Sequence, residues 1–120
     1  MARIMIVDVK PSVREALAMV LEIDGHEVAV AATAQAALDR AAAFRPDVML
    51  VDPHLPDMSL AAFCAALGGI CRTPVVVMSL HPADRTQAEA SGAAAFLAKP
   101  FAPAELIATL RRCTSLSICR

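Results

Sequence analysis

Four polar residues of this 120-residue chain stand at the ends of short apolar runs, and together they could handle a phosphoryl group. Asp8, Asp52 and Ser79 each come directly after such a run, and Lys99 comes at the end of another. Paired carboxylates suit a hard divalent cation, above all Mg²⁺, which binds few protein oxygens and keeps several waters. An ammonium and a hydroxyl beside them suit a phosphoryl group, because the ammonium neutralises its oxygens and the hydroxyl donates a hydrogen bond.

The usual phosphate-binding loops are missing from the sequence. No GxxxxGK[ST] motif occurs, and the first apolar run is followed by Asp8-Val9-Lys10-Pro11 rather than GxGxxG. A nucleotide is therefore a poor ligand, and an obvious acceptor for a phosphoryl group is a carboxylate, which would become an acyl phosphate. Taken singly, each of the four residues also has an ordinary role open to it, such as a helix cap, a turn residue or a surface charge.

Apolar runs alternate with helical segments along the whole chain. Three of the runs contain only Val, Ile, Leu and Met, which is typical of strands buried on both faces of a parallel sheet. The predicted strands are Ile4–Val7, Glu27–Val30, Val48–Val51, Val75–Met78 and Ala94–Ala98. The predicted helices are Ser12–Asp24, Ala34–Phe44, Leu60–Leu67, Ala83–Ala90 and Pro103–Cys113.

Local signals mark the ends of several helices. Ser12 and Glu15 predict a capping box at the start of the first helix, and Gly25 is placed to end it. Gly92 is placed to end the fourth helix. Cys113–Arg120 is open to two interpretations, the last turn of the final helix or the start of a linker.

Five strand–helix units predict an α/β fold, a doubly wound (βα)5 sandwich of the flavodoxin-like type, with residues 1–120 forming one domain. Right-handed crossovers place helices on both faces of a parallel five-stranded sheet, for which we expect the order 2-1-3-4-5. In such sheets the ligand site lies beyond the carboxyl ends of the strands, where the strand order reverses. We therefore expect the four polar residues to meet at that edge.

Composition excludes several classes of function. With 58% hydrophobic and 19% charged residues, the chain is not disordered, and its net charge of −1 offers no basic field for a nucleic acid. No apolar run is long enough to span a membrane. The aromatic content of 3% disfavours a site that stacks a flavin or a base, so a flavodoxin-type enzyme is not supported. The four cysteines form no CxxC pair and no signal peptide opens the chain, which predicts reduced thiols in a cytoplasmic protein.

Several segments resemble the response-regulator receiver domain of two-component signalling, over essentially the whole chain. Their order and spacing together are highly specific for that family. The segments are Ile4–Asp8, Pro46–Asp52 with Leu55-Pro56, Pro74–Ser79, Ser91–Ala93 and Phe96–Phe101. The resemblance implies a signalling domain and not an enzyme, one that at most catalyses its own phosphoryl transfer and dephosphorylation. Its implied partners are a histidine kinase or phosphotransfer protein as the donor and a downstream protein or effector domain as the target.

The resemblance also implies roles for the polar residues. Asp52 would be the phospho-acceptor, and Lys99 would contact the phosphate. Asp8 and Asp52, with the backbone carbonyl of His54, would hold Mg²⁺.

The same resemblance implies a switch and a cis peptide bond. Ser79 would move toward the phosphate, and Phe96 would rotate with it. The face made by the fourth helix, fifth strand and fifth helix would then change its partner preference, with a homodimer among its expected partners. The bond between Lys99 and Pro100 would be cis, a form that proline makes accessible.

The largest departure from the family is Val9, where a second acid normally binds the metal directly. Because the charge of the ligands sets affinity for hard cations, we expect Mg²⁺ binding to be weaker by about 1–3 kcal/mol. The next residue, Lys10, is either a surface charge or an ammonium that replaces part of the charge of the metal.

Other departures lie in the loops. Leu80 stands where the family has a small residue, and there it would narrow the route to the acceptor. Ser59-Leu60 replaces an Asp-Gly pair, which changes the start of the third helix. His54 and His81 flank the expected pocket either as solvated loop residues, or to tune access of water, or to bind a borderline metal with the two carboxylates.

These observations leave two interpretations. The first is a receiver that is phosphorylated on Asp52, and the presence of Ser79 and Lys99 favours it. The second is a degenerate receiver that acts as a phosphorylation-independent interaction module, which Val9, Leu80 and Ser59-Leu60 favour. Binding of Mg²⁺ and of a phosphoryl mimic discriminates between them.

Overall fold

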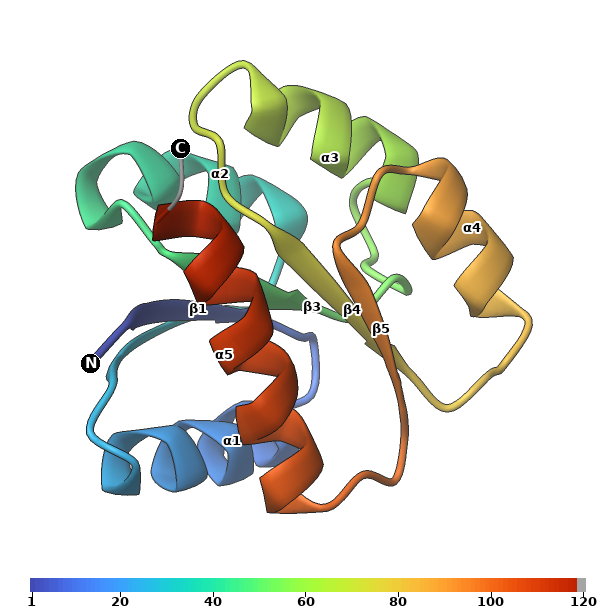
Figure 1. Cartoon of the computed structure of the whole chain (residues 1–120). Coiled ribbons are helices and arrows are strands. Elements are labelled where there is room, and N and C mark those ends of the chain that lie inside the picture. Colours follow the sequence, from blue (N-terminus) through green and yellow to red (C-terminus); the bar gives the residue numbers. More distant parts are fainter. Residues whose placement is uncertain (119–120) are drawn as a thin grey trace.

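The computed structural model describes residues 1–118, within which five strands and five helices alternate (Figure 1). The strands are β1 (Arg3–Val7), β2 (Glu27–Ala31), β3 (Val48–Val51), β4 (Val75–Ser79) and β5 (Ala95–Ala98). The helices are α1 (Pro11–Ile23), α2 (Ala34–Phe44), α3 (Leu60–Gly68), α4 (Asp84–Ala90) and α5 (Pro103–Ile118).

All strands pair in parallel in one sheet of order β2-β1-β3-β4-β5, so the predicted fold and strand order are confirmed. Helices α1 and α5 cover one face of the sheet, and α2, α3 and α4 cover the other (Figure 1). The order reverses between β1 and β3, since the chain leaves β1 in one direction to form β2 and returns on its other side. That reversal places the ends of β1 and β3 next to each other.

Each face of the sheet has its own apolar core. Met5 and Val7 pack with the side chains of α2 and α3, whereas Ile4 and Ile6 pack with those of α1 and α5. Successive side chains of a strand point to opposite faces, so a strand between two cores is apolar at every position. This explains why β3 and most of β1 and β4 (Ile4–Val7 and Val75–Met78) are continuous apolar runs that are buried throughout.

The capping box predicted for the first helix is wrong. Helix α1 begins at Pro11 with Lys10 as its N-cap residue, and no side chain caps it. Proline fits the first position of a helix because its missing N–H has no partner there in any helix. Ser12 consequently lies inside the first turn. Gly25 follows the helix with φ of 91°, a left-handed conformation that glycine adopts without strain, as predicted.

Other element ends differ from the sequence predictions by small amounts. Ser79 is the last residue of β4 rather than the first after it, and β5 begins at Ala95. Helix α5 continues to Ile118, so a linker from Cys113 is wrong as far as the described chain extends. The peptide bond between Lys99 and Pro100 is cis, as the resemblance implied.

Cys64, Cys71 and Cys113 are free thiols, and Cys119 lies outside the described residues. Over residues 1–118, no helix has the length and apolar character needed to cross a membrane.

Candidate functional site

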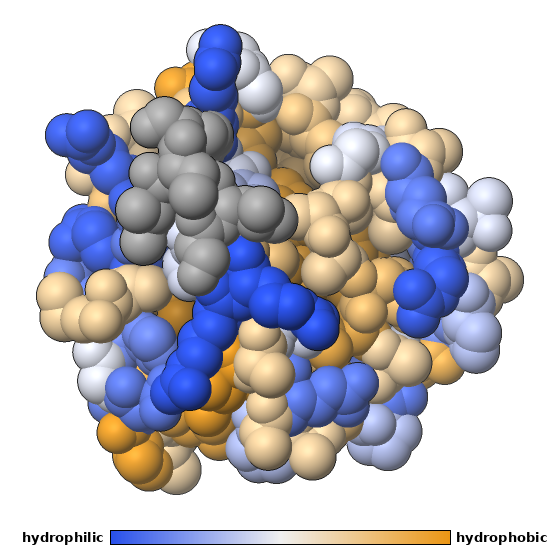
Figure 2. Space-filling view, viewed as in Figure 1, coloured by the Kyte–Doolittle hydropathy of each residue, from blue (hydrophilic) through white to orange (hydrophobic). Residues whose placement is uncertain are grey.

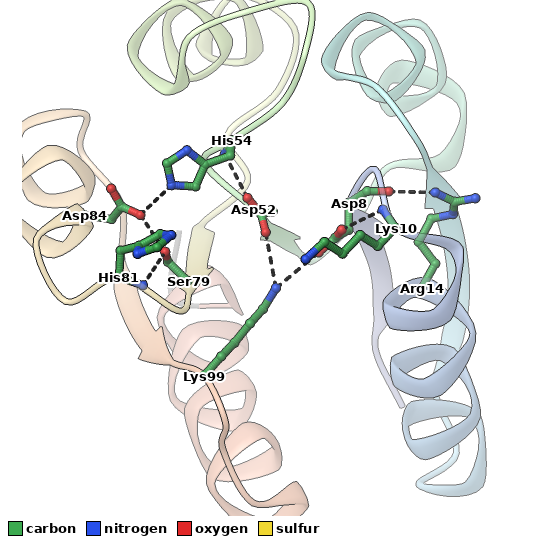
Figure 3. Close-up of polar contacts among 9 residues, drawn as sticks. All are labelled: Asp8, Lys10, Arg14, Asp52, His54, Ser79, His81, Asp84 and Lys99. Carbon is green, nitrogen blue, oxygen red and sulfur yellow. Dashed lines mark hydrogen bonds and ion pairs between the residues drawn. The ribbon is translucent and has the colours of Figure 1, made fainter.

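Lys99 joins two carboxylates at the carboxyl edge of the sheet (Figure 3). Its Nζ lies 3.3 Å from Oδ2 of Asp8 and 3.2 Å from Oδ2 of Asp52. The side chain of Asp8 is fully buried, and those of Asp52 and Lys99 are only 16% and 15% exposed. Three of the predicted site residues therefore form one cluster, with two negative charges facing one positive charge.

The sheet itself positions these three residues. The backbone N–H groups of Asp8, Asp52 and Lys99 each make one more hydrogen bond to the neighbouring strand, one residue past the end of their own strand. These hydrogen bonds hold the backbone from which the three side chains project. The pairs are Asp8 N–H to the Ala31 carbonyl at 3.1 Å, Asp52 N–H to Val7 at 3.0 Å, and Lys99 N–H to Ser79 at 2.8 Å.

The connection between β1 and α1 holds Asp8 further. The backbone N–H of Lys10 donates to Oδ1 of Asp8 at 2.9 Å, so both carboxylate oxygens have partners. The guanidinium of Arg14 donates to the Asp8 carbonyl at 2.7 Å, a contact that sequence reasoning missed. The Lys10 side chain is exposed and points toward the same group of residues (Figure 3). Its role in replacing the charge of a metal stays a prediction.

The donor atoms at this edge fit Mg²⁺ in kind but are few. Asp8 and Asp52 supply carboxylate oxygens, the donor type that Mg²⁺ prefers. Val9, where a third carboxylate is expected, is an apolar side chain that is 46% exposed. Among residues 1–118, no group of three or more His, Cys, Asp and Glu side chains could hold a metal ion. The alternative in which two histidines and the carboxylates bind a borderline metal is therefore not supported.

The loop after β3 is held at both ends by hydrogen bonds. The backbone N–H of His54 donates to Oδ1 of Asp52 at 2.8 Å. Asp57 accepts from the backbone N–H groups of Gln35 at 2.9 Å and Ala34 at 3.0 Å, which ties the loop to the start of α2. Ser59 then caps α3. With Ser59-Leu60 in place of the Asp-Gly pair of the family, α3 begins at Leu60 with Ser59 as its N-cap.

The Asp57 contacts predict a pH-dependent contribution to stability. The hydrogen bonds from Gln35 and Ala34 hold the pKa of the Asp57 carboxyl below its ordinary value of 3.8. A carboxyl with a depressed pKa stabilises the fold above its unfolded pKa, and that stabilisation is lost as pH falls through the folded value. We expect wild type to be more stable than Asp57→Asn at neutral pH, with the difference shrinking below pH 3.8. Urea unfolding of both proteins across this range measures it, and a difference that does not change with pH would contradict it.

Ser79 lies at the site but its hydroxyl is bonded elsewhere. Its Oγ donates to Oδ2 of Asp84 at 2.5 Å and accepts from the backbone N–H of His81 at 3.0 Å. Nε2 of His54 lies 2.8 Å from the same oxygen of Asp84. The rings of His54 and His81 meet edge to face, with centroids 5.4 Å apart. Both predicted loop histidines therefore flank the site, and His54, whose side chain is 59% exposed, is also hydrogen-bonded to Asp84.

Asp84 is the site residue that sequence reasoning missed. Its partial burial raises its pKa, but hydrogen bonds from Ser79 and His54 lower it more, so the pKa lies below the ordinary value of 3.8. The positive charges of His54 and His81, when protonated, act in the same direction. Asp84 is therefore a carboxylate at neutral pH. The available signal was its position as an acid at the start of a helix that follows a strand-end hydroxyl.

Two further predicted residues lie on β5 and directly after β4. Phe96 is half-buried, and the guanidinium of Arg85 lies 4.8 Å from the centre of its ring. Leu80 is 57% exposed and lines an apolar cleft of about 400 Å³ between α1 and the β5–α5 connection, which Lys99 and Phe101 also line. The narrowing of the route to Asp52 by Leu80 stays a prediction.

Comparison with known proteins identifies the relatives of this chain. The response regulator receiver domain family matches residues 4–111. The transcriptional regulatory protein KdpE of Mycobacterium tuberculosis is 36% identical over 113 residues, which cover 92% of this chain and 50% of that protein. The chain thus spans about half the length of this curated relative.

Solved structures agree with this relationship. The chemotaxis response regulator CheY4 of Vibrio cholerae is 32% identical, with a TM-score of 0.84 over 94% of this chain and 98% of that one. The receiver domain of the sensor histidine kinase PA1611 of Pseudomonas aeruginosa is 25% identical, with a TM-score of 0.85 over 95% and 98% of the two chains. The PA1611 domain has a magnesium ion coordinated in its active-site cleft.

Proposed function

This chain belongs to the response regulator receiver domain family of two-component signalling, and we propose that Asp52 accepts its phosphoryl group. The donor is a histidine kinase or a phosphotransfer protein. The observation that carries the proposal is the Lys99 ammonium, which lies 3.2 Å from Oδ2 of Asp52, with the Lys99 and Asp52 side chains only 15% and 16% exposed. A cation in that position neutralises charge on phosphoryl oxygens as they arrive.

In the proposed reaction an oxygen of the Asp52 carboxylate attacks the phosphorus atom of a phosphohistidine. The new O–P bond forms as the P–N bond breaks, and the electron pair of that bond stays on the imidazole nitrogen of the donor. Lys99 stabilises the negative charge on the transferring group. Asp8 and Asp52, with the His54 carbonyl, would hold Mg²⁺, which supplies further positive charge to the phosphoryl oxygens when bound. We expect that binding to be weakened by Val9.

The proposed output follows from the position of Ser79. Movement of its hydroxyl toward the new phosphoryl group would draw the β4–α4 connection with it, and the half-buried Phe96 would move into the space released. The face formed by α4, β5 and α5 would then change. In Figure 2 hydrophilic side chains lie over α4 and α5, and weakly hydrophobic residues lie between them. Exposed Ala98, Ala104 and Ala108 fit a face that contacts a downstream protein, an effector domain or a second copy.

Beryllofluoride, which mimics a phosphoryl group on aspartate, tests this proposal directly. Amide NMR spectra recorded with excess Mg²⁺, before and after beryllofluoride is added, should shift near Asp8, Asp52, Ser79 and Lys99. Shifts that extend to Phe96 would support a working switch. A folded domain whose spectrum does not change would favour the phosphorylation-independent interaction module instead.

A further inference from the structure

Ser79 has one hydroxyl hydrogen, and it is already in use. The Oγ–H group donates to Oδ2 of Asp84 at 2.5 Å, and Ser79 is only 2% exposed. A serine hydroxyl donates one hydrogen bond at a time. Ser79 can therefore donate to Asp84 or to a phosphoryl oxygen on Asp52, but not to both.

The acceptor of this hydrogen bond is well held. The side chain of Asp84 is 13% exposed, and Nε2 of His54 lies 2.8 Å from the same Oδ2. The backbone N–H of His54 in turn donates to Oδ1 of Asp52 at 2.8 Å. The carboxylate of Asp52 is thus connected to the Ser79 hydroxyl through His54 and Asp84 (Figure 3). The backbone N–H of His54 contacts Asp52, and its ring contacts Asp84, which accepts from Ser79.

We propose that Asp84 is a positioning residue that holds the Ser79 hydroxyl away from Asp52 and so opposes the switch. The inference rests on the proposed phosphorylation of Asp52. In the unphosphorylated protein Asp84 competes as an anion for the same hydrogen that the phosphoryl group must attract. Hydrogen bonds to charged groups are stronger than neutral ones, and partial burial strengthens them further. Ser79 must break its hydrogen bond to Asp84 before it can donate to the phosphoryl group. The free energy needed to break that bond is lost from the free energy of phosphoryl binding, so less is available to move α4.

The test measures beryllofluoride affinity by NMR titration in excess Mg²⁺ for wild type, Asp84→Asn and Asp84→Ala. Removing the competing carboxylate should raise the affinity of Asp84→Ala about tenfold, the lower end of the effect of a hydrogen bond to a charged group. Asp84→Asn keeps the shape and a weaker acceptor, so its affinity should fall between the other two. It also keeps the test valid if the alanine variant does not fold.

Two controls separate the proposed role from a structural one. Glu89→Ala removes an exposed carboxylate from the same helix, and it should leave the affinity at the wild-type value. In a Ser79→Ala background, Asp84→Ala should change the affinity by less than about twofold, because the competing hydrogen bond is already absent. If Asp84 only stabilised the start of α4, its removal would lower the melting temperature without raising the affinity.

The outcomes distinguish the inference from the function on which it rests. A wild-type protein that binds beryllofluoride, with Asp84 variants that bind no more tightly than Glu89→Ala, would overturn the role of Asp84 and leave the proposed function standing. An equal gain with and without Ser79 would also overturn it. Failure of every variant to bind would overturn both. Binding by Asp84→Ala that exceeds wild-type binding only when Ser79 is present would support both.

Discussion

The Asp52→Asn protein is expected to take up no phosphoryl group from acetyl phosphate, whereas wild type takes up one. The amide that replaces the carboxylate has the same shape but is not a nucleophile toward phosphorus, so the O–P bond cannot form. The Lys99 ammonium keeps Asp8 as its partner at 3.3 Å, so the local structure should survive. Mass spectrometry of the intact protein measures the uptake.

A matched control lies in the same loop. Asp57→Asn makes the same chemical change at an exposed carboxylate that contacts the start of α2, and it should leave phosphoryl uptake intact. If Asp52→Asn still gained a phosphoryl group, the acceptor would be another residue and the proposed function would be wrong in its central point. Peptide mapping of the labelled wild-type protein would identify that residue.

The Val9→Asp protein is expected to bind Mg²⁺ about 5- to 150-fold more tightly than wild type. This range corresponds to about 1–3 kcal/mol, the contribution of a hydrogen bond or contact to a charged group. Val9 is 46% exposed beside the buried Asp8, so a carboxylate at this position can stay hydrated and need not be buried to reach the site mouth. A third carboxylate raises the negative charge of the donor set, which increases its affinity for a hard cation.

Calorimetric titration with MgCl₂ measures this effect, with Val9→Asn as the control of similar size and no charge. Val9→Asn should bind Mg²⁺ within about threefold of wild type, because an amide contributes no negative charge. Equal affinities for wild type and Val9→Asp would show that Val9 does not weaken the site. In that case Lys10, whose side chain points toward the same residues, would be the next position to change (Figure 3).

The fold and the cluster of Asp8, Asp52 and Lys99 were predictable from the sequence because both depend on the strands of the sheet. Strand segments buried on both faces are apolar at successive positions, so most of β1, β3 and β4 stands out in the sequence as continuous apolar runs. Parallel strands end at a common edge of the sheet, so the residues at their carboxyl ends lie close together whatever path the following loops take. The common edge of the sheet brings Asp8, Asp52 and Lys99 close to one another.

The partners of the loop side chains were decided by the tertiary structure alone. Whether the Ser79 hydroxyl faces Asp52 or Asp84 depends on the path of the β4–α4 connection, and no periodicity in the sequence records that path. The hydrogen bond between His54 and Asp84 and the one from Ala34 to Asp57 at the start of α2 likewise depend on the paths of loops. Periodicity fixes which face of an element is buried, whereas a hydrogen bond between two loops depends on distances of a few tenths of an ångström. Sequence therefore determined which groups are present at this edge of the sheet, and tertiary structure determined which of them are bonded to one another.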